Sequence, residues 1–70
     1  MHEVRSSTIS HLDHDPLKNE LTVRFHNGST YTYPEVTGDE YLALLHAPSV
    51  GKHFGEHIRL KKKGIRHGSN

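Results

Sequence analysis

Eight histidines among 70 residues give the chain many nitrogen atoms that could bind a metal ion. Residues 53–57 match the pattern H-x-x-E-H, which would place His53 and His57 four positions apart on one face of a helix. A catalytic zinc site also needs a third ligand and a substrate cleft, and so short a chain has little material for either. We therefore predict neither a metal site nor enzymatic activity, and expect at most adventitious binding of zinc or nickel.

A second group of possible metal ligands lies at residues 11–15, which read H-L-D-H-D. On a strand, His11 and His14 would point to opposite faces, so they could not bind one ion without a bend. Turn formation explains these residues better. Cysteine is absent, no serine lies in a G-x-S-x-G motif, and Gly51-Lys52 lacks the upstream glycine of a phosphate-binding loop. We therefore expect no cofactor.

Positive charge is concentrated at the C-terminal end of the sequence. Residues 57–70 carry five bases and no acid, whereas residues 1–56 carry four bases and eight acids. A basic segment of this kind can contact phosphates or an acidic protein surface, or it can remain solvated. If the ligand is a nucleic acid, the candidate phosphate contacts are Arg59, Lys61, Lys62, Lys63 and Arg66.

Residues 20–33 predict a β-hairpin that carries two tyrosines on its second strand. Apolar and polar residues alternate from 20 to 25, which is the pattern of a half-buried strand. The Asn27-Gly28 pair that follows is a strong signal for a hairpin turn. Residues 29–33, S-T-Y-T-Y, then supply the returning strand before a proline ends it.

The length of the hairpin loop decides which way Tyr31 and Tyr33 point. A two-residue turn places Arg24 opposite Tyr31, and both rings then leave the apolar face of the first strand. They would form an exposed aromatic platform beside Arg24, suited to stacking on bases or to anchoring a protein partner. A three-residue loop with a bulge at Gly28 places Phe25 opposite Tyr31, and both rings join the core. We favour the core register and keep the exposed register as the alternative.

Two helices are expected after the hairpin. Residues 37–40, T-G-D-E, form a capping box, so the first helix should run from Thr37 to about Ala47, where a proline ends it. Ser49 can cap a second helix. That helix should run from Val50 to about Leu60, because its apolar residues recur every four positions.

Composition limits the fold to one small domain. Hydrophobic residues make up 31% of the chain and the mean hydropathy is −0.76, which allows one thin core and no deep substrate pocket. We predict an α+β fold, with a three-stranded antiparallel sheet packed against two short C-terminal helices. Residues 7–60 should form this domain, between a flexible N-terminal arm, 1–6, and a flexible basic tail, 61–70. No apolar run approaches the ~20 residues that span a bilayer, so we expect a cytoplasmic protein without a membrane partner.

The order of these residues resembles the KTSC domain family. The resemblance runs from Ser6 to about Arg59 and centres on the Y-x-Y element at residues 31–33, followed by Ser49-x-Gly51 and Phe54. The family is named for the C-termini of some lysyl-tRNA synthetases and also includes stand-alone bacterial and phage proteins. The resemblance implies a small module, and its synthetase context suggests RNA binding. The chain departs from the family pattern at Gly55, often asparagine there, and at residues 61–63, which replace a more aromatic ending.

Two functions follow from these observations as hypotheses. The first is a non-enzymatic, monomeric regulator of the kind that phages encode, which docks on a larger assembly such as RNA polymerase or the translation apparatus. Its candidate contacts are Val4, Arg5, Arg24, Tyr31 and Tyr33. The alternative is an RNA-binding module that uses the basic C-terminal residues and the two tyrosines. Neither hypothesis includes a small-molecule substrate.

Overall fold

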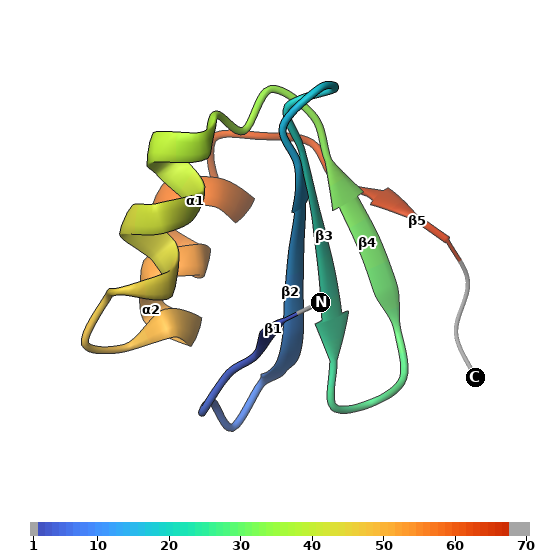
Figure 1. The fold of residues 1–70 in the computed structure, drawn as a ribbon. Coiled ribbons are helices and arrows are strands. Elements are labelled where there is room, and N and C mark those ends of the chain that lie inside the picture. Colours follow the sequence, from blue (N-terminus) through green and yellow to red (C-terminus); the bar gives the residue numbers. More distant parts are fainter. Residues whose placement is uncertain (1, 68–70) are drawn as a thin grey trace.

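The computed structural model describes residues 2–67 of the chain. They form one antiparallel sheet with the strand order β1-β2-β3-β4-β5, and α1 and α2 lie together on one side of it (Figure 1). The strands are β1 (His2–Glu3), β2 (Ile9–Asp15), β3 (Glu20–Phe25), β4 (Thr30–Tyr33) and β5 (Ile65–Arg66). The helical elements are α1 (Gly38–Leu45), α2 (Val50–Phe54) and the π-helix η1 (Gly55–Arg59).

The predicted α+β class, with an antiparallel sheet and short C-terminal helices, is confirmed, but the sheet has five strands where three were predicted. β1 pairs with β2, and β5 pairs with β4, so the sheet extends beyond the limits predicted for the domain at residues 7 and 60. Both additional strands contain two residues. So short a segment carries no alternating pattern, which is why the sequence did not reveal them.

Four residues, 26–29, lie between β3 and β4, and Gly28 is in the left-handed region at φ 92°. The Phe25 amide donates to the Ser29 carbonyl at 2.9 Å, and the Gly28 amide donates to the Phe25 carbonyl at 3.0 Å. A left-handed glycine at the end of a short hairpin loop is typical of a type I turn followed by a glycine bulge.

Both predicted sets of strand pairs were wrong. The structure pairs Val23 with Tyr31 and Leu21 with Tyr33. This register arises because the hairpin closes with the hydrogen bond from the Phe25 amide to the Ser29 carbonyl, so that only residues 26–28 lie inside that bond. Cross-strand partners share a face of the sheet, so both tyrosines lie on the face of Leu21 and Val23. The predicted three-residue loop placed both tyrosine rings on the core side of the sheet, and this part of the prediction is confirmed.

Apolar side chains of the sheet and the helices meet in one core. Every second residue of β3 points toward the helices, as strand geometry requires; of these, Leu21 and Val23 are buried and Phe25 is half-buried. The buried apolar residues are Ile9, Leu12, Leu21, Val23, Tyr33, Val36, Tyr41, Leu44, Val50, Phe54 and Ile58. Because Tyr33 and Phe54 belong to this core, it fixes the position of α2 relative to β4.

The predicted capping box begins α1. The Thr37 hydroxyl accepts from the Glu40 amide at 3.2 Å, and the Glu40 carboxylate accepts from the Thr37 amide at 3.1 Å. These contacts satisfy amide groups that have no partner within the helix. The helix itself ends at Leu45, two residues before the predicted end.

The second helix begins as predicted, but its second half is a π-helix and not an α-helix. The Ser49 hydroxyl accepts from the Lys52 amide at 3.4 Å and caps α2. From Gly55 the chain continues as the π-helix η1, which the uniform apolar spacing did not indicate. No helix within residues 2–67 combines the length and the apolar character needed to cross a membrane.

Candidate ligand-binding cleft

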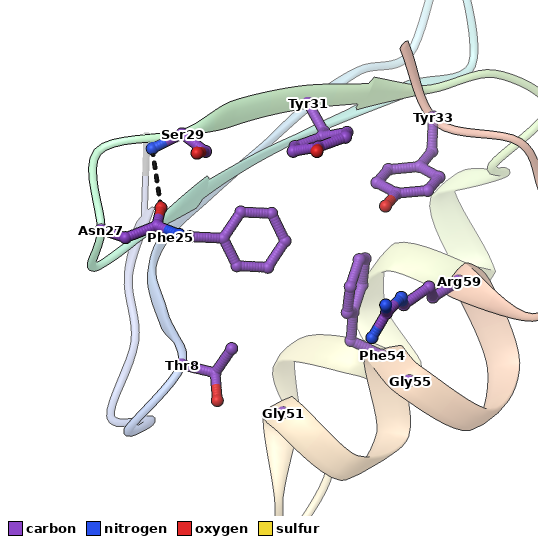
Figure 2. Close-up of a pocket in the computed structure, with 10 residues that line it drawn as sticks. All are labelled: Thr8, Phe25, Asn27, Ser29, Tyr31, Tyr33, Gly51, Phe54, Gly55 and Arg59. Atoms are coloured by element: carbon purple, nitrogen blue, oxygen red, sulfur yellow. Dashed lines mark hydrogen bonds between the residues drawn. The ribbon is translucent and has the colours of Figure 1, made fainter. Parts of the chain in front are cut away.

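An open cleft lies between the β3–β4 hairpin and the helical segment formed by α2 and η1 (Figure 2). Its volume is about 510 Å³, which is in the range of small-ligand sites. The lining residues are Thr8, Phe25, Asn27, Ser29, Tyr31, Tyr33, Gly51, Phe54, Gly55 and Arg59. The cleft therefore combines an aromatic interior with a cationic side chain.

Four aromatic rings of the cleft contact one another in a closed circuit. Their centroid distances are 5.7 Å for Phe25–Tyr31, 6.3 Å for Tyr31–Tyr33, 5.2 Å for Tyr33–Phe54 and 5.8 Å for Phe54–Phe25. All four distances are typical of favourable aromatic pairs. Tyr33 and Phe54 are only 5% and 3% exposed, whereas Phe25 and Tyr31 are half-buried. The accessible aromatic surface of the cleft is therefore that of Phe25 and Tyr31.

The helical side of the cleft includes two glycines four positions apart. A Cβ atom at Gly51 would lie 3.1 Å from the Ser6 hydroxyl, so that glycine allows the N-terminal segment to pack against α2. A Cβ atom at Gly55 would have no neighbouring atom within 4 Å. The helix thus presents bare backbone and open space to the cleft at Gly55.

Arg59 connects the aromatic cleft to a basic rim, which is formed by Arg59 and Lys61 to Lys63. Together with Tyr31 and Tyr33 it also lines a second hollow, which is completed by residues 60–64. Within residues 4–67, no carboxylate lies within 4.0 Å of the charged groups of Arg59, Lys61 or Lys63. Burial raises the pKa of the Tyr33 phenol, and the positive charge of Arg59 opposes this rise. Arg59, Lys61 and Lys63, which lack a carboxylate partner within residues 4–67, therefore line the same hollow as Tyr31 and Tyr33.

Lys62 differs from its neighbours because it makes contacts within the protein. Its ammonium group donates to the Glu35 carbonyl at 2.6 Å and lies 3.6 Å from the Glu40 carboxylate. Glu40 is also the carboxylate of the α1 capping box. Of the five predicted phosphate contacts, Lys62 therefore supports the fold and has less freedom to meet a ligand.

The predicted site residues fall into separate regions of the structure. Tyr31 and Tyr33 lie in the cleft, and Arg66 lies opposite Tyr31 on the neighbouring strand. Arg24 is exposed on the other face of the sheet, opposite Thr30. The remaining two residues, Val4 and Arg5, precede β2: Val4 packs against the core and Arg5 is exposed. The structure thus joins the tyrosines to the basic residues and separates them from Arg24.

The histidine motifs occupy other surfaces. The rings of His53 and His57 lie with their centroids 4.4 Å apart on α2 and η1. His14 contacts the core side, where its ring stacks on Tyr41 and its Nε2 lies 2.6 Å from the Val36 carbonyl oxygen. Among the described residues, no three His, Asp or Glu side chains gather as a metal site would require. The absence of a metal site in the protein stays a prediction.

Seven residues that line the cleft were not among the predicted site residues: Thr8, Phe25, Asn27, Ser29, Gly51, Phe54 and Gly55. The two phenylalanines were read only as core residues, because a hydrophobic period does not distinguish a buried ring from one at the edge of a cleft. The two helical glycines were the available signal, since each costs a helix about 1 kcal/mol relative to alanine.

These features define a small α+β module with an aromatic cleft and a basic rim. The chain belongs to the KTSC domain family, whose model matches residues 5–61. The match covers the central strands, both α-helices and η1, and it ends within the basic rim.

Two relatives and one solved structure are similar to the chain, and the solved structure belongs to a KTSC domain protein. An uncharacterized protein from Stutzerimonas stutzeri is 38% identical over 53 residues, which are 76% of this chain and 75% of the relative. A protein from Tsukamurella paurometabola is 40% identical over 52 residues, 74% and 78% of the two chains. The crystal structure of a KTSC domain protein from Yersinia pestis matches with a TM-score of 0.90 at 28% identity, and covers 96% of this chain and 94% of that one.

Proposed function

We propose that this chain is a non-enzymatic cytoplasmic module that binds single-stranded RNA along its aromatic cleft and basic rim. The observation that supports this proposal is the continuity of the two surfaces, because Tyr31, Tyr33 and Arg59 line both hollows. Proteins that bind single strands pair a positively charged groove for the backbone with aromatic rings for the bases.

The distribution of charge favours an anionic strand over a cationic or neutral ligand. Arg59, Lys61 and Lys63 have no carboxylate partner within residues 4–67, so they are free to neutralise phosphates. Each phosphate contact releases counterions, which makes the affinity depend on salt concentration. The other predicted cation of this segment, Arg66, is exposed on β5 beside Tyr31 and extends the same rim.

Fluorescence anisotropy with a short labelled single-stranded RNA tests the proposal. Affinity should fall as salt rises from about 50 to about 200 mM, with a log–log slope of roughly −0.7 per phosphate contact. The double variant Lys61→Glu/Lys63→Glu should bind roughly tenfold or more weakly and show a shallower slope. The matched control is Lys18→Glu/Lys52→Glu, which reverses two exposed lysines that line neither the cleft nor the second hollow. Binding that is absent, or equal in both double variants, would refute the proposal.

A second candidate function, docking on a protein assembly such as RNA polymerase, is favoured by two exposed apolar side chains. Leu60 is 80% exposed and Ile65 is 57% exposed, and both lie on the segment that carries the basic rim. A tagged protein would then retain a partner at fixed stoichiometry from nuclease-treated lysate, and Leu60→Ser/Ile65→Ser would lose it. Partners that disappear with nuclease would favour RNA.

A further inference from the structure

Gly55 is a glycine that the fold itself does not require. Its backbone has ordinary right-handed helical angles, φ −60° and ψ −40°, so no left-handed conformation demands glycine. A Cβ atom there would meet nothing within 4 Å, so no close packing demands it either. Alanine at this position would strengthen the helix. The reason for glycine must therefore lie in the space that faces it, and Gly55 lines the aromatic cleft.

The space over Gly55 is bounded on its other sides by groups that suit a flat aromatic ligand. Phe25 and Tyr31 approach from the sheet, and Phe54 approaches from α2 (Figure 2). Phe25 is half-buried and meets Tyr31 and Phe54 edge-on, with interplanar angles of 88° and 67°. An arrangement of half-buried rings around an open space can accept one more planar ring by stacking or by edge contact.

Polar groups stand at both ends of the cleft. Thr8, Asn27 and Ser29 line one end, where the Asn27 side-chain oxygen accepts from the Ser29 amide at 2.9 Å. Arg59 lines the other end and adjoins the basic rim. The edge of a bound base could form hydrogen bonds with the amide and hydroxyl groups at the first end, while its phosphate binds the Arg59 guanidinium at the other. Proteins that bind an unstacked base use polar groups for the base edge and cationic groups for the phosphate in this way.

We infer that the cleft receives a single nucleobase of the bound strand, and that Gly55 keeps the cleft open for it. This inference rests on the proposed RNA binding and goes further, because it distinguishes a base receptor from a surface that contacts phosphates only. The base lies between the ring edges of Phe25 and Tyr31 and the bare backbone at Gly55. A side chain at position 55 would occupy the place of the base.

The test uses a single-stranded RNA in which one nucleotide carries the fluorescent base 2-aminopurine, whose emission falls on stacking. Wild-type protein should quench this emission. Gly55→Leu should abolish the quenching and weaken binding roughly tenfold, the scale of one stacked base. Gly38→Leu is the matched control, because position 38 also has no atom within 4 Å and lies on α1, outside the cleft.

The outcomes separate the two proposals. Salt-dependent binding together with loss of quenching only in Gly55→Leu supports the base receptor. Binding without quenching, or equal quenching in Gly55→Leu, overturns the receptor and leaves RNA binding by the basic rim intact. A strand that does not bind to wild-type protein overturns both. If Gly55→Leu melts below wild type, Gly55→Ala replaces it, and unchanged quenching and affinity in that variant overturn the receptor.

Discussion

Gly51, Gly55 and Gly64 lack a side chain for three different reasons. Gly51 makes room for the Ser6 hydroxyl, which accepts from the Thr8 and Ile9 amides and so shapes the turn before β2. Gly64 passes against Tyr33, because a Cβ atom there would lie 2.6 Å from the ring. Gly55 faces open space. The first two glycines therefore support the fold, and only the third is available for a ligand.

Alanine substitutions at two of these glycines should change stability in opposite directions. Gly64→Ala forces a methyl group into the Tyr33 ring, and overpacking of this kind costs about 1 to 3 kcal/mol. Gly55→Ala adds a methyl group in open space to a helical residue and should raise the free energy of unfolding by up to about 1 kcal/mol. Urea denaturation measures both. Equal stability of the two variants would contradict this account of the glycines.

The Tyr33 phenol should ionise at a higher pH than a free tyrosine. Burial raises its pKa above the ordinary value of 10.0, and a second effect, the positive charge of Arg59, works in the other direction. The folded state thus holds this proton more tightly than the unfolded state, so the stabilisation is complete below pH 10 and is lost as the pH rises through the folded pKa. Phenolate absorbance during an alkaline titration measures the shift. Arg59→Gln should raise the pKa of Tyr33 further, and an unchanged or lower pKa in that variant would refute the effect of the Arg59 charge.

The C-terminal segment joins the first helix to the last strand. Lys62 contacts both the Glu35 carbonyl and the capping carboxylate of Glu40, and three residues later β5 pairs with β4. The His67 amide extends this pairing by donating to the Thr30 carbonyl at 2.8 Å. The basic rim is therefore held at both ends, and its cations project from a segment of defined position.

The Glu40 carboxylate should make stability depend on pH in acid. Its pKa is lowered from the ordinary 4.5, mainly because the Thr37 amide donates to it, with a further contribution from Lys62. The stabilisation is complete above pH 4.5 and is lost as the pH falls through the lower folded pKa. Because the side chain is 40% exposed, we expect only about 0.5 kcal/mol.

The variant Glu40→Gln isolates the charge, because glutamine can keep the capping hydrogen bond. Its free energy of unfolding should lie below that of wild type at neutral pH and converge with it at about pH 3. Thermal melts across this range provide the comparison. A difference that stays constant with pH would show that the charge of Glu40 contributes nothing.

The elements that the sequence predicted are those with a local signal. The capping box of α1, the Ser49 cap and the alternation in β3 each lie within a few residues, and each appears in the structure. β1, β5 and the π-helical continuation at Gly55 have no such signal. Their formation depends on partners far away in the chain, such as the open edges of β2 and β4.

The cleft forms only in the folded molecule, because its lining residues come from several elements. Phe25 and Tyr31 come from the hairpin, Thr8 from the segment before β2, and Gly55 and Arg59 from η1. The sequence indicated the tyrosines and the basic segment separately. Only the folded structure places Arg59 in the same hollows as Tyr31 and Tyr33, while Arg24, predicted for the same site, lies on the other face of the sheet.

The central claim is that one surface, formed by the aromatic cleft and the basic rim, binds a single RNA strand. Two-dimensional ¹H–¹⁵N NMR of the labelled protein, titrated with a short single-stranded RNA, tests it most directly. We predict that the amide signals of Thr8, Ser29, Tyr31, Gly55 and Arg59 and of residues 60–64 move together in one saturable process. The signals of Arg24 and of α1 should stay in place. Movement confined to Arg24 and its face of the sheet, or a spectrum that does not change, would contradict the claim.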